Sequence, residues 1–229
     1  MATVKMKLAD AFSPDCRKCS RLAEFLKSIG QKYPTYYARP VPSFGVDQPR
    51  LLIVGLAPGL HGANRTGRPF TGDHAGLLLY RTLHRYGFAT TDESISSDDG
   101  LKLIDCRITN AVRCVPPGNK PTTQEVKCCN PYLQQELAGL NAESIVLALG
   151  SVAHAAILRA LALRPADYRF AHAGQHRLPG GLRLVDSYHC SRYNTQTRRL
   201  TEDMFRAVFV TVRNLIEPRG TDESLQTAF

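Results

Sequence analysis

The sequence predicts an α/β domain with a mostly parallel sheet, because β-type runs alternate with segments of helical periodicity. Parallel strands need crossover connections, and helices supply them on both faces of such a sheet. A length of 229 residues suffices for one well-cored domain and is short for two, so we expect a single domain over 1–229. Four strands are predicted, at 50–55, 103–112, 144–150 and 182–188.

The first third of the chain is predicted to hold a helix, a buried strand and a second helix. The run SRLAEFLKSI carries Leu22, Phe25 and Ile29 at helical spacing, with Ser20 as a candidate N-cap. RLLIVG has the continuous apolar character of a buried strand. We expect an irregular segment at 1–19, a helix at 20–29, a long surface connection at 31–49, a strand at 50–55, a glycine-rich loop at 56–74 and a helix at about 76–87.

The remaining two thirds repeat the alternation of strand and helix. LIDCRITNAV, SIVLALG and LRLVDSY have the apolar runs of strands, and Thr122 or Thr123 is suited to cap a helix that ends near Gly139. We expect an acidic loop at 90–100, a rigid loop at 113–123, helices at 151–162 and 197–216, and a frayed tail at 218–229.

Composition narrows the class of protein. Apolar residues make up 43% and charged residues 21%, which is typical of a globular chain. No run of about 18 apolar residues occurs and the N-terminus lacks a signal-peptide core, so we expect a cytoplasmic protein without a membrane partner. The 29 basic and 20 acidic residues give a net charge of +9. This excess fits a polyanion such as nucleic acid, although charge alone does not decide the partner.

The seven cysteines point to metal ligation or catalysis, because disulfides are rare in the cytoplasm. Cys16 and Cys19 form a CxxC pair, and Cys114 with Cys128 or Cys129 adds further thiols. These spacings exclude a local zinc knuckle, so a shared site must join the N-terminus to the middle of the chain. Thiol ligands suit zinc and an iron–sulfur cluster equally, so both interpretations are kept. A third interpretation is that these cysteines are buried apolar residues without a metal.

The other two candidate cysteines have simpler interpretations. Cys106 lies within an apolar strand and is predicted to be a core residue. Cys190 follows His189, but side chains of adjacent residues point apart, which argues against a Cys–His nucleophile.

Polar or glycine-rich loops follow three of the predicted strands, starting at Gly55, Asn110 and His189. Ligands bind at the carboxyl ends of the strands in sheets of this kind, so we expect these loops to converge on one site. The loop 55–76 lacks both the P-loop pattern and the dinucleotide fingerprint, which disfavours a nucleotide cofactor.

Two residues of that loop have alternative interpretations. Phe70 either stacks on a base or anchors the loop by packing. Asp73 either caps the following helix or is a carboxylate that activates water.

Three stretches of the chain carry a family resemblance: GLAPGLHGANRTGRPFTGD, TNAVRCVPPGNKPT and HCSRYNTQTRRLT. They resemble the signature stretches of B-type, or family 5, uracil-DNA glycosylases. The similarity extends over about residues 14–210, and the order and spacing of the stretches match the family. The combination is specific, whereas any one stretch alone would be weak.

The resemblance implies a three-layer α/β/α domain with a central, mostly parallel four-stranded sheet and a structural four-iron four-sulfur (4Fe-4S) cluster. Its ligands are carried over as Cys16, Cys19, Cys114 and Cys129. Cys129 is preferred to Cys128 because the last ligand of the family precedes an x-Pro-aromatic-Leu run, here residues 130–133.

The resemblance also implies the roles of the site residues. Related glycosylases carry an acidic residue just after the first strand, where this chain has Leu56 and Ala57, so Asp73 is the carboxylate left nearby. We expect Asp73 to position water, Asn110 to read one edge of uracil and His189 to stabilise the departing base. The pocket residues are expected to be Gly55, Ala57, Gly59, Phe70, Asn110 and His189, and the DNA contacts Arg65, Arg192, Tyr193 and Asn194.

The function implied is a monofunctional DNA glycosylase that removes uracil, and also hypoxanthine and other deaminated bases, at the start of base excision repair. Lys120 is the one lysine in the three stretches, which disfavours a Schiff-base lyase. We expect a monomer acting on double-stranded and single-stranded DNA in the nucleoid. Two alternatives are a zinc-containing nucleic-acid-binding module and a redox or nucleotide-handling enzyme, and the missing fingerprint disfavours the second.

Overall fold

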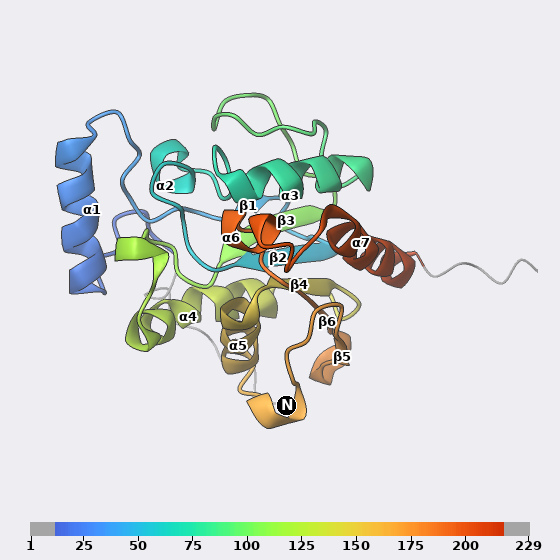
Figure 1. Ribbon diagram of the computed structural model, residues 1–229. Coiled ribbons are helices and arrows are strands. Elements are labelled where there is room, and N and C mark those ends of the chain that lie inside the picture. Colours follow the sequence, from blue (N-terminus) through green and yellow to red (C-terminus); the bar gives the residue numbers. More distant parts are fainter. Residues whose placement is uncertain (1–11, 218–229) are drawn as a thin grey trace, which may run out of the picture.

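The computed structural model describes residues 12–217 and contains one six-stranded sheet between helices (Figure 1). The strand order is β1-β3-β2-β4-β6-β5. Both edge pairings are antiparallel and the three inner pairings are parallel. The strands are β1 Phe44–Gly45, β2 Leu51–Gly55, β3 Cys106–Asn110, β4 Ile145–Leu149, β5 Gln175–Arg177 and β6 Arg183–Ser187.

The four inner strands confirm the four predicted from apolar runs, but the sheet has two more. Strands β1 and β5 hold two and three residues, and their side chains are exposed or half-buried. Strands so short and so open to solvent need no apolar run, so the sequence pattern did not reveal them. The prediction of a four-stranded sheet is therefore wrong in strand number, while the mostly parallel α/β architecture is confirmed.

Helices cover both faces of the sheet, since every residue of β2 is buried although successive side chains point to opposite faces. Leu51 and Ile53 pack in one core with side chains of α3 and α7, such as Leu79 and Phe205. Leu52 and Val54 pack in a second core with α4 and α5. Figure 1 shows these helix pairs on opposite sides of the sheet. The helices are α1 Ser20–Lys32, α2 Ala63–Thr66, α3 His74–Arg85, α4 Thr123–Ala138, α5 Ser151–Ala160, α6 Arg192–Gln196 and α7 Glu202–Ile216, with 3-10 turns at Pro117–Asn119, Pro165–Asp167 and Pro179–Gly181.

Helix ends differ from prediction in three places. Helix α1 begins after Cys19, which makes no side-chain cap, so Ser20 is not the N-cap, and the helix continues through Gly30. The predicted helix 197–216 begins only at Glu202, as α7, which Thr201 caps, and the short helix α6 lies before it in the predicted loop. Thr122 does cap α4, in a reciprocal capping box with Glu125.

The register of the inner strands sets the edge at which the loops emerge. Gly55 pairs with Asn110, and Leu149 pairs with Ser187, so the carboxyl ends of four strands finish at one level. Residues 12–19 form turns without helix or strand. The predicted tail 218–229 and residues 1–11 lie outside the described residues. Within 12–217, no helix is both long and apolar enough to cross a bilayer.

Candidate active site and cysteine cavity

A cavity of about 590 Å³ opens at the carboxyl ends of the inner strands. The loops after β2, β3, β4 and β6 all contribute to its walls, which confirms that the predicted loops converge. Its lining includes Ala57, Gly59, Phe70, Asp73, Asn110 and His189 from the predicted set.

Two rings and an amide form the buried end of this cavity. The rings of Phe70 and His189 are stacked, with centroids 5.9 Å apart and planes inclined by 26°. Phe70 has a φ of 57°, a left-handed backbone conformation that is unfavourable for a bulky residue. Its ring therefore belongs to a strained and tightly held turn rather than to a freely packed loop.

Gly55 lies directly behind this pair because no larger residue fits there. A Cβ at Gly55 would lie 2.4 Å from Asn110 Oδ1 and 2.6 Å from Phe70 Cζ. The glycine thus sets how closely the amide and the ring approach the end of β2. Gly55 is not itself part of the cavity lining.

Asn110 and His189 both present buried polar atoms without a protein partner. Among residues 12–217, Asn110 Oδ1 and His189 Nδ1 have no hydrogen-bond partner. Such atoms are costly to bury unless water or a ligand satisfies them. Burial lowers the pKa of His189 to about 4, so its imidazole is neutral near pH 7. The site therefore offers an amide and a neutral imidazole to a polar ligand.

Asp73 occupies the N-cap position of α3, but its side chain does not cap that helix. Its Oδ2 accepts a hydrogen bond from the amide of Ala63, 3.2 Å away. Gly59 and Gly62 permit this approach, since a Cβ at Gly62 would lie 1.9 Å from Asp73 Oδ1. Burial raises the pKa of Asp73, while the Ala63 amide and Arg65 oppose that shift. The carboxylate is thus held at the cavity wall by the glycine-rich loop.

The structure places two of the four predicted DNA-contact residues at the cavity. Arg192 and Asn194 line the cavity, whereas Tyr193 is 69% exposed and does not line it. Asn194 Nδ2 donates to the carbonyl of His189 at 2.8 Å, so this side chain holds the His189 backbone. Arg65 is exposed and lies in a separate surface hollow beside Tyr36.

A second, smaller cavity collects five of the seven cysteines. Its walls include Cys16, Cys19, Cys114, Cys128 and Cys129, brought together from the N-terminal turns, the loop after β3 and α4. The amide of Arg113 donates to Cys129 Sγ at 3.3 Å, and Tyr132 Oη donates to Cys16 Sγ at 3.2 Å.

The donor set of this cavity fits a thiolate-ligated group. Burial and the neighbouring sulfurs raise the pKa of Cys129 to about 11 and that of Cys19 to about 12, so these thiols ionise near pH 7 only beside a cationic partner. Hydrogen bonds from N–H and O–H groups to sulfur are the contacts that stabilise cluster thiolates. Cys106 and Cys190 are fully buried in the main core, as expected for Cys106.

Comparison with known proteins identifies the family. The family model described as the Uracil DNA glycosylase superfamily matches residues 42–213. A type-5 uracil-DNA glycosylase of Thermus thermophilus is 45% identical over 205 residues, covering 87% of this chain and 93% of that protein. The chain belongs to the uracil-DNA glycosylase superfamily.

Further relatives give the same assignment within the uracil-DNA glycosylase superfamily. A type-5 enzyme of Mycobacterium leprae is 43% identical over 211 residues, with 87% of this chain and 91% of that protein covered. A type-5 enzyme of Pyrobaculum aerophilum is 37% identical over 198 residues, covering 85% and 86%. A type-4 enzyme of the same organism is 35% identical over 147 residues, covering 63% and 66%. The resemblance stated from the three sequence stretches is confirmed.

Sequence reasoning missed several cavity residues of this superfamily member. Ser151 and Val152 at the start of α5, Phe170 in the α5–β5 connection, and Tyr188 and Arg199 also line the cavity. Ser151 follows directly on a predicted strand and was therefore within reach of the strand-end argument. Phe170 lies in a connection of mixed polarity, and no sequence pattern there indicates that it folds back over the sheet.

Proposed function

We propose that this protein hydrolyses the N-glycosidic bond of uracil in double-stranded and single-stranded DNA, starting base excision repair. The observation that carries the proposal is the pairing of two unpartnered polar atoms, on Asn110 and His189, with the carboxylate of Asp73 in one cavity. A base in duplex DNA is out of reach until it is flipped, which costs a few kcal/mol. The net charge of +9 favours binding to the DNA phosphates, and Arg192 lines the cavity, where it can contact them.

The flipped uracil would stack on Phe70 and bond to Asn110. Asn110 Oδ1 accepts the N3–H of uracil, and its amide group donates to the O4 carbonyl. This pattern matches uracil. It does not match cytosine, which has an acceptor where uracil has the N3–H donor and an amino donor where uracil has the O4 acceptor. Discrimination of this kind is strong because a wrong base leaves buried polar groups unpaired.

Bond cleavage would move the C1′–N1 electron pair onto the base. The neutral imidazole of His189 donates a hydrogen bond to uracil O2, where the negative charge collects. Asp73 stabilises the cationic sugar and accepts a hydrogen bond from a water molecule. The water oxygen bonds to C1′ and its proton passes through Asp73 to solvent, so no covalent enzyme intermediate forms.

We also propose that hypoxanthine and other deaminated bases enter the same cavity. Leu56 and Ala57 line it at the positions where related glycosylases carry an acidic side chain, and they leave that part of the wall uncharged. The comparison of uracil, hypoxanthine and cytosine in matched duplexes tests this, and release of uracil alone would contradict it.

A 4Fe-4S cluster held by Cys16, Cys19, Cys114 and Cys129 is proposed for the cysteine cavity. When bound, the cluster would tie the N-terminal turns to α4 and would act structurally. Cys128 lines the same cavity. Substitution of Cys128 and of Cys129 in turn therefore tests which of the two is the fourth ligand. Broad absorbance near 400 nm with matching iron and sulfide contents is expected, as is typical of cysteine-ligated clusters.

The deciding experiment is single-turnover release of base from a labelled duplex with one uracil. Wild-type protein should release uracil, and protein with Asn110→Ala should lose most of this activity while retaining its absorbance spectrum. A well-folded wild-type protein that releases no base, with the cluster present, would contradict the proposal. Borohydride trapping of a protein–DNA adduct would contradict the monofunctional mechanism.

A further inference from the structure

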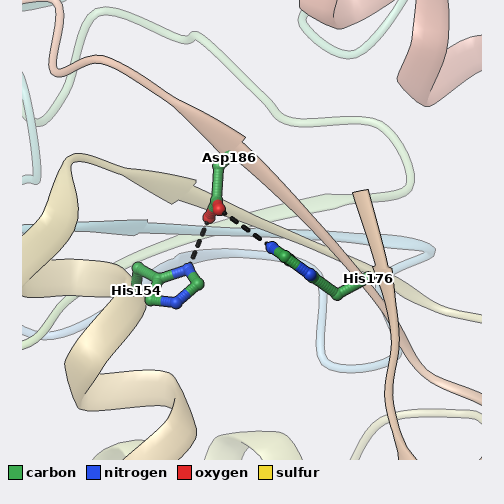
Figure 2. A group of neighbouring side chains, drawn as sticks. All are labelled: His154, His176 and Asp186. Carbon is green, nitrogen blue, oxygen red and sulfur yellow. Dashed lines mark hydrogen bonds and ion pairs between the residues drawn. The ribbon is translucent and has the colours of Figure 1, made fainter. Parts of the chain in front are cut away.

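A buried group of three ionisable side chains lies outside the active-site lining. Asp186 on β6 stands between His154 on α5 and His176 on β5, as Figure 2 shows. His154 Nδ1 lies 2.8 Å from Asp186 Oδ1, and His176 Nε2 lies 3.3 Å from Asp186 Oδ2. The Asp186 side chain is fully buried, and those of His154 and His176 are 5% and 16% exposed.

The hydrogen bonds of His154 fix its charge. Its Nε2 lies 2.8 Å from the carbonyl oxygen of Tyr168, which can only accept, so Nε2 carries a proton. Its Nδ1 faces a carboxylate oxygen, which also accepts when ionised. With Asp186 ionised, both ring nitrogens donate and His154 is an imidazolium paired with this carboxylate. A buried carboxylate is stable only with such a partner.

Further contacts near this group hold the segment 168–174 against the carboxyl end of β6. Asp186 exchanges backbone hydrogen bonds of 2.9 Å with Ala173 and Gly174. The amide of Tyr188 donates to His172 Nδ1 at 3.2 Å, and the rings of His172 and Tyr188 are stacked 4.9 Å apart.

Phe170 connects this segment to the active-site cavity. Its ring meets the His154 ring edge-on at 5.6 Å and lies 6.1 Å from the Tyr188 ring. Phe170 and Tyr188 both line the cavity, as does Val152, which is 41% exposed. The Arg199 guanidinium lies 4.8 Å over the Tyr188 ring. An apolar rim with a flanking cation suits the sugars and bases of an unstacked strand.

We propose that His154 is a positioning residue, whose ion pair with Asp186 and bond to Tyr168 hold Phe170 at the rim that receives the DNA beside the flipped nucleotide. The inference rests on the proposed function, because it assumes that DNA occupies the cavity. His154 does not touch the substrate, and its effect passes through Phe170.

Deprotonation of His154 would loosen this contact. Burial by itself lowers the pKa of His154, but the hydrogen bond and charge of Asp186 and the Tyr168 carbonyl outweigh it and raise the pKa. Asp186 and His176 face the ring from the sheet, and the Tyr168 ring packs on His176 at 5.8 Å. The stabilisation that the His154–Asp186 ion pair provides is complete below pH about 6.5. It is lost as the pH rises through the raised pKa of His154.

The test measures binding of full-length, cluster-loaded protein to a duplex with an uncleavable abasic-site analogue, from pH 6 to 9. The affinity of the wild-type protein for this duplex should fall with rising pH more than that of His154→Gln does. Phe170→Ala should raise Kd roughly tenfold, the scale of one lost base–aromatic contact. The double variant should bind as Phe170→Ala alone, because His154 acts through that ring. His84→Gln, on the exposed face of α3, is the matched control.

Several outcomes would overturn the inference. Additive effects of the two substitutions, or a pH dependence of His154→Gln equal to that of wild type, would show that His154 does not act through Phe170. If His154→Gln does not fold, wild-type affinity in Phe170→Ala overturns the inference on its own. A bound zinc ion, detected as stoichiometric zinc whose removal reproduces the His154→Gln effect, would replace the ion pair with a metal site. Wild-type uracil release is recorded in parallel, so failure of the proposed function is recognised separately.

Discussion

Asp73 accepts a hydrogen bond from the amide of Ala63, and not from the first turn of the helix that it precedes. Of the two interpretations of this residue, the geometry therefore gives no support to a side-chain cap. The carboxylate is instead fixed on the cavity wall by a loop in which Gly59 and Gly62 leave room for it.

Asp73→Asn is expected to lower the single-turnover rate of uracil release by about 10²-fold or more, the scale of one lost electrostatic partner in a transition state. The amide keeps the size of the side chain but carries no charge to stabilise the sugar cation. Because the side chain does not cap α3, thermal stability should change little. A rate within a few-fold of wild type would remove Asp73 from the proposed mechanism.

Gly55→Ala is expected to abolish most activity while the protein remains folded. The added Cβ would lie within 2.6 Å of both the Asn110 amide oxygen and the Phe70 ring, so the base-reading end of the cavity must shift. The parallel β2–β3 ladder, which does not depend on that side chain, should persist. Gly139→Ala, at a glycine with negative φ where the nearest atom to the added Cβ lies 3.6 Å away, is the control for a glycine substitution that fits. Equal activities of the two variants would contradict the prediction.

The sequence predicted the inner strands and the convergence of their loops for one physical reason. Continuous apolar runs such as 50–55 are needed only where both faces of a strand are covered, and this requires parallel strands with crossover helices. Once the strands are parallel, Gly55 and Asn110 must end at the same edge. Register then adds what the pattern could not supply, namely that these two residues are direct partners.

The cluster of His154, His176 and Asp186 was not predictable in the same way. It depends on the antiparallel pairing of β5 with β6, and β5 is a three-residue strand in which only His176 is half-buried. No periodicity marks such a strand, so nothing in the sequence aligns His176 with Asp186. Phe170 was missed for the related reason that long-range packing, and not local pattern, folds its segment over the cavity.

His189 is expected to act as a neutral hydrogen-bond donor over the whole working range. Burial lowers its pKa to about 4, so it gains a proton only as the pH falls through that value. His189→Ala should reduce single-turnover release by about 10²-fold, whereas His189→Gln, which keeps a neutral donor, should lose less.

The pH profile separates a neutral His189 from a cationic one. Neither wild type nor His189→Gln should show a step in rate near pH 6.5 that is due to this residue. The depressed pKa also means that the unfolded chain binds the extra proton first, so wild-type stability should fall relative to His189→Gln as the pH drops from about 6.5 toward 4. A step near pH 6.5 that the glutamine variant lacks would show that the cation is the active form.

Cys129→Ala is expected to lose the absorbance near 400 nm and much of the thermal stability, whereas Cys128→Ala should retain both. Cys129 is 8% exposed and accepts a hydrogen bond from the Arg113 amide, while Cys128, one residue earlier on α4, is less buried. Cys190→Ala, in the main core, controls for loss of a thiol. Iron content per chain distinguishes the variants directly. Retention of full iron in Cys129→Ala together with its loss in Cys128→Ala would reassign the fourth ligand to Cys128, because both residues line the same cavity.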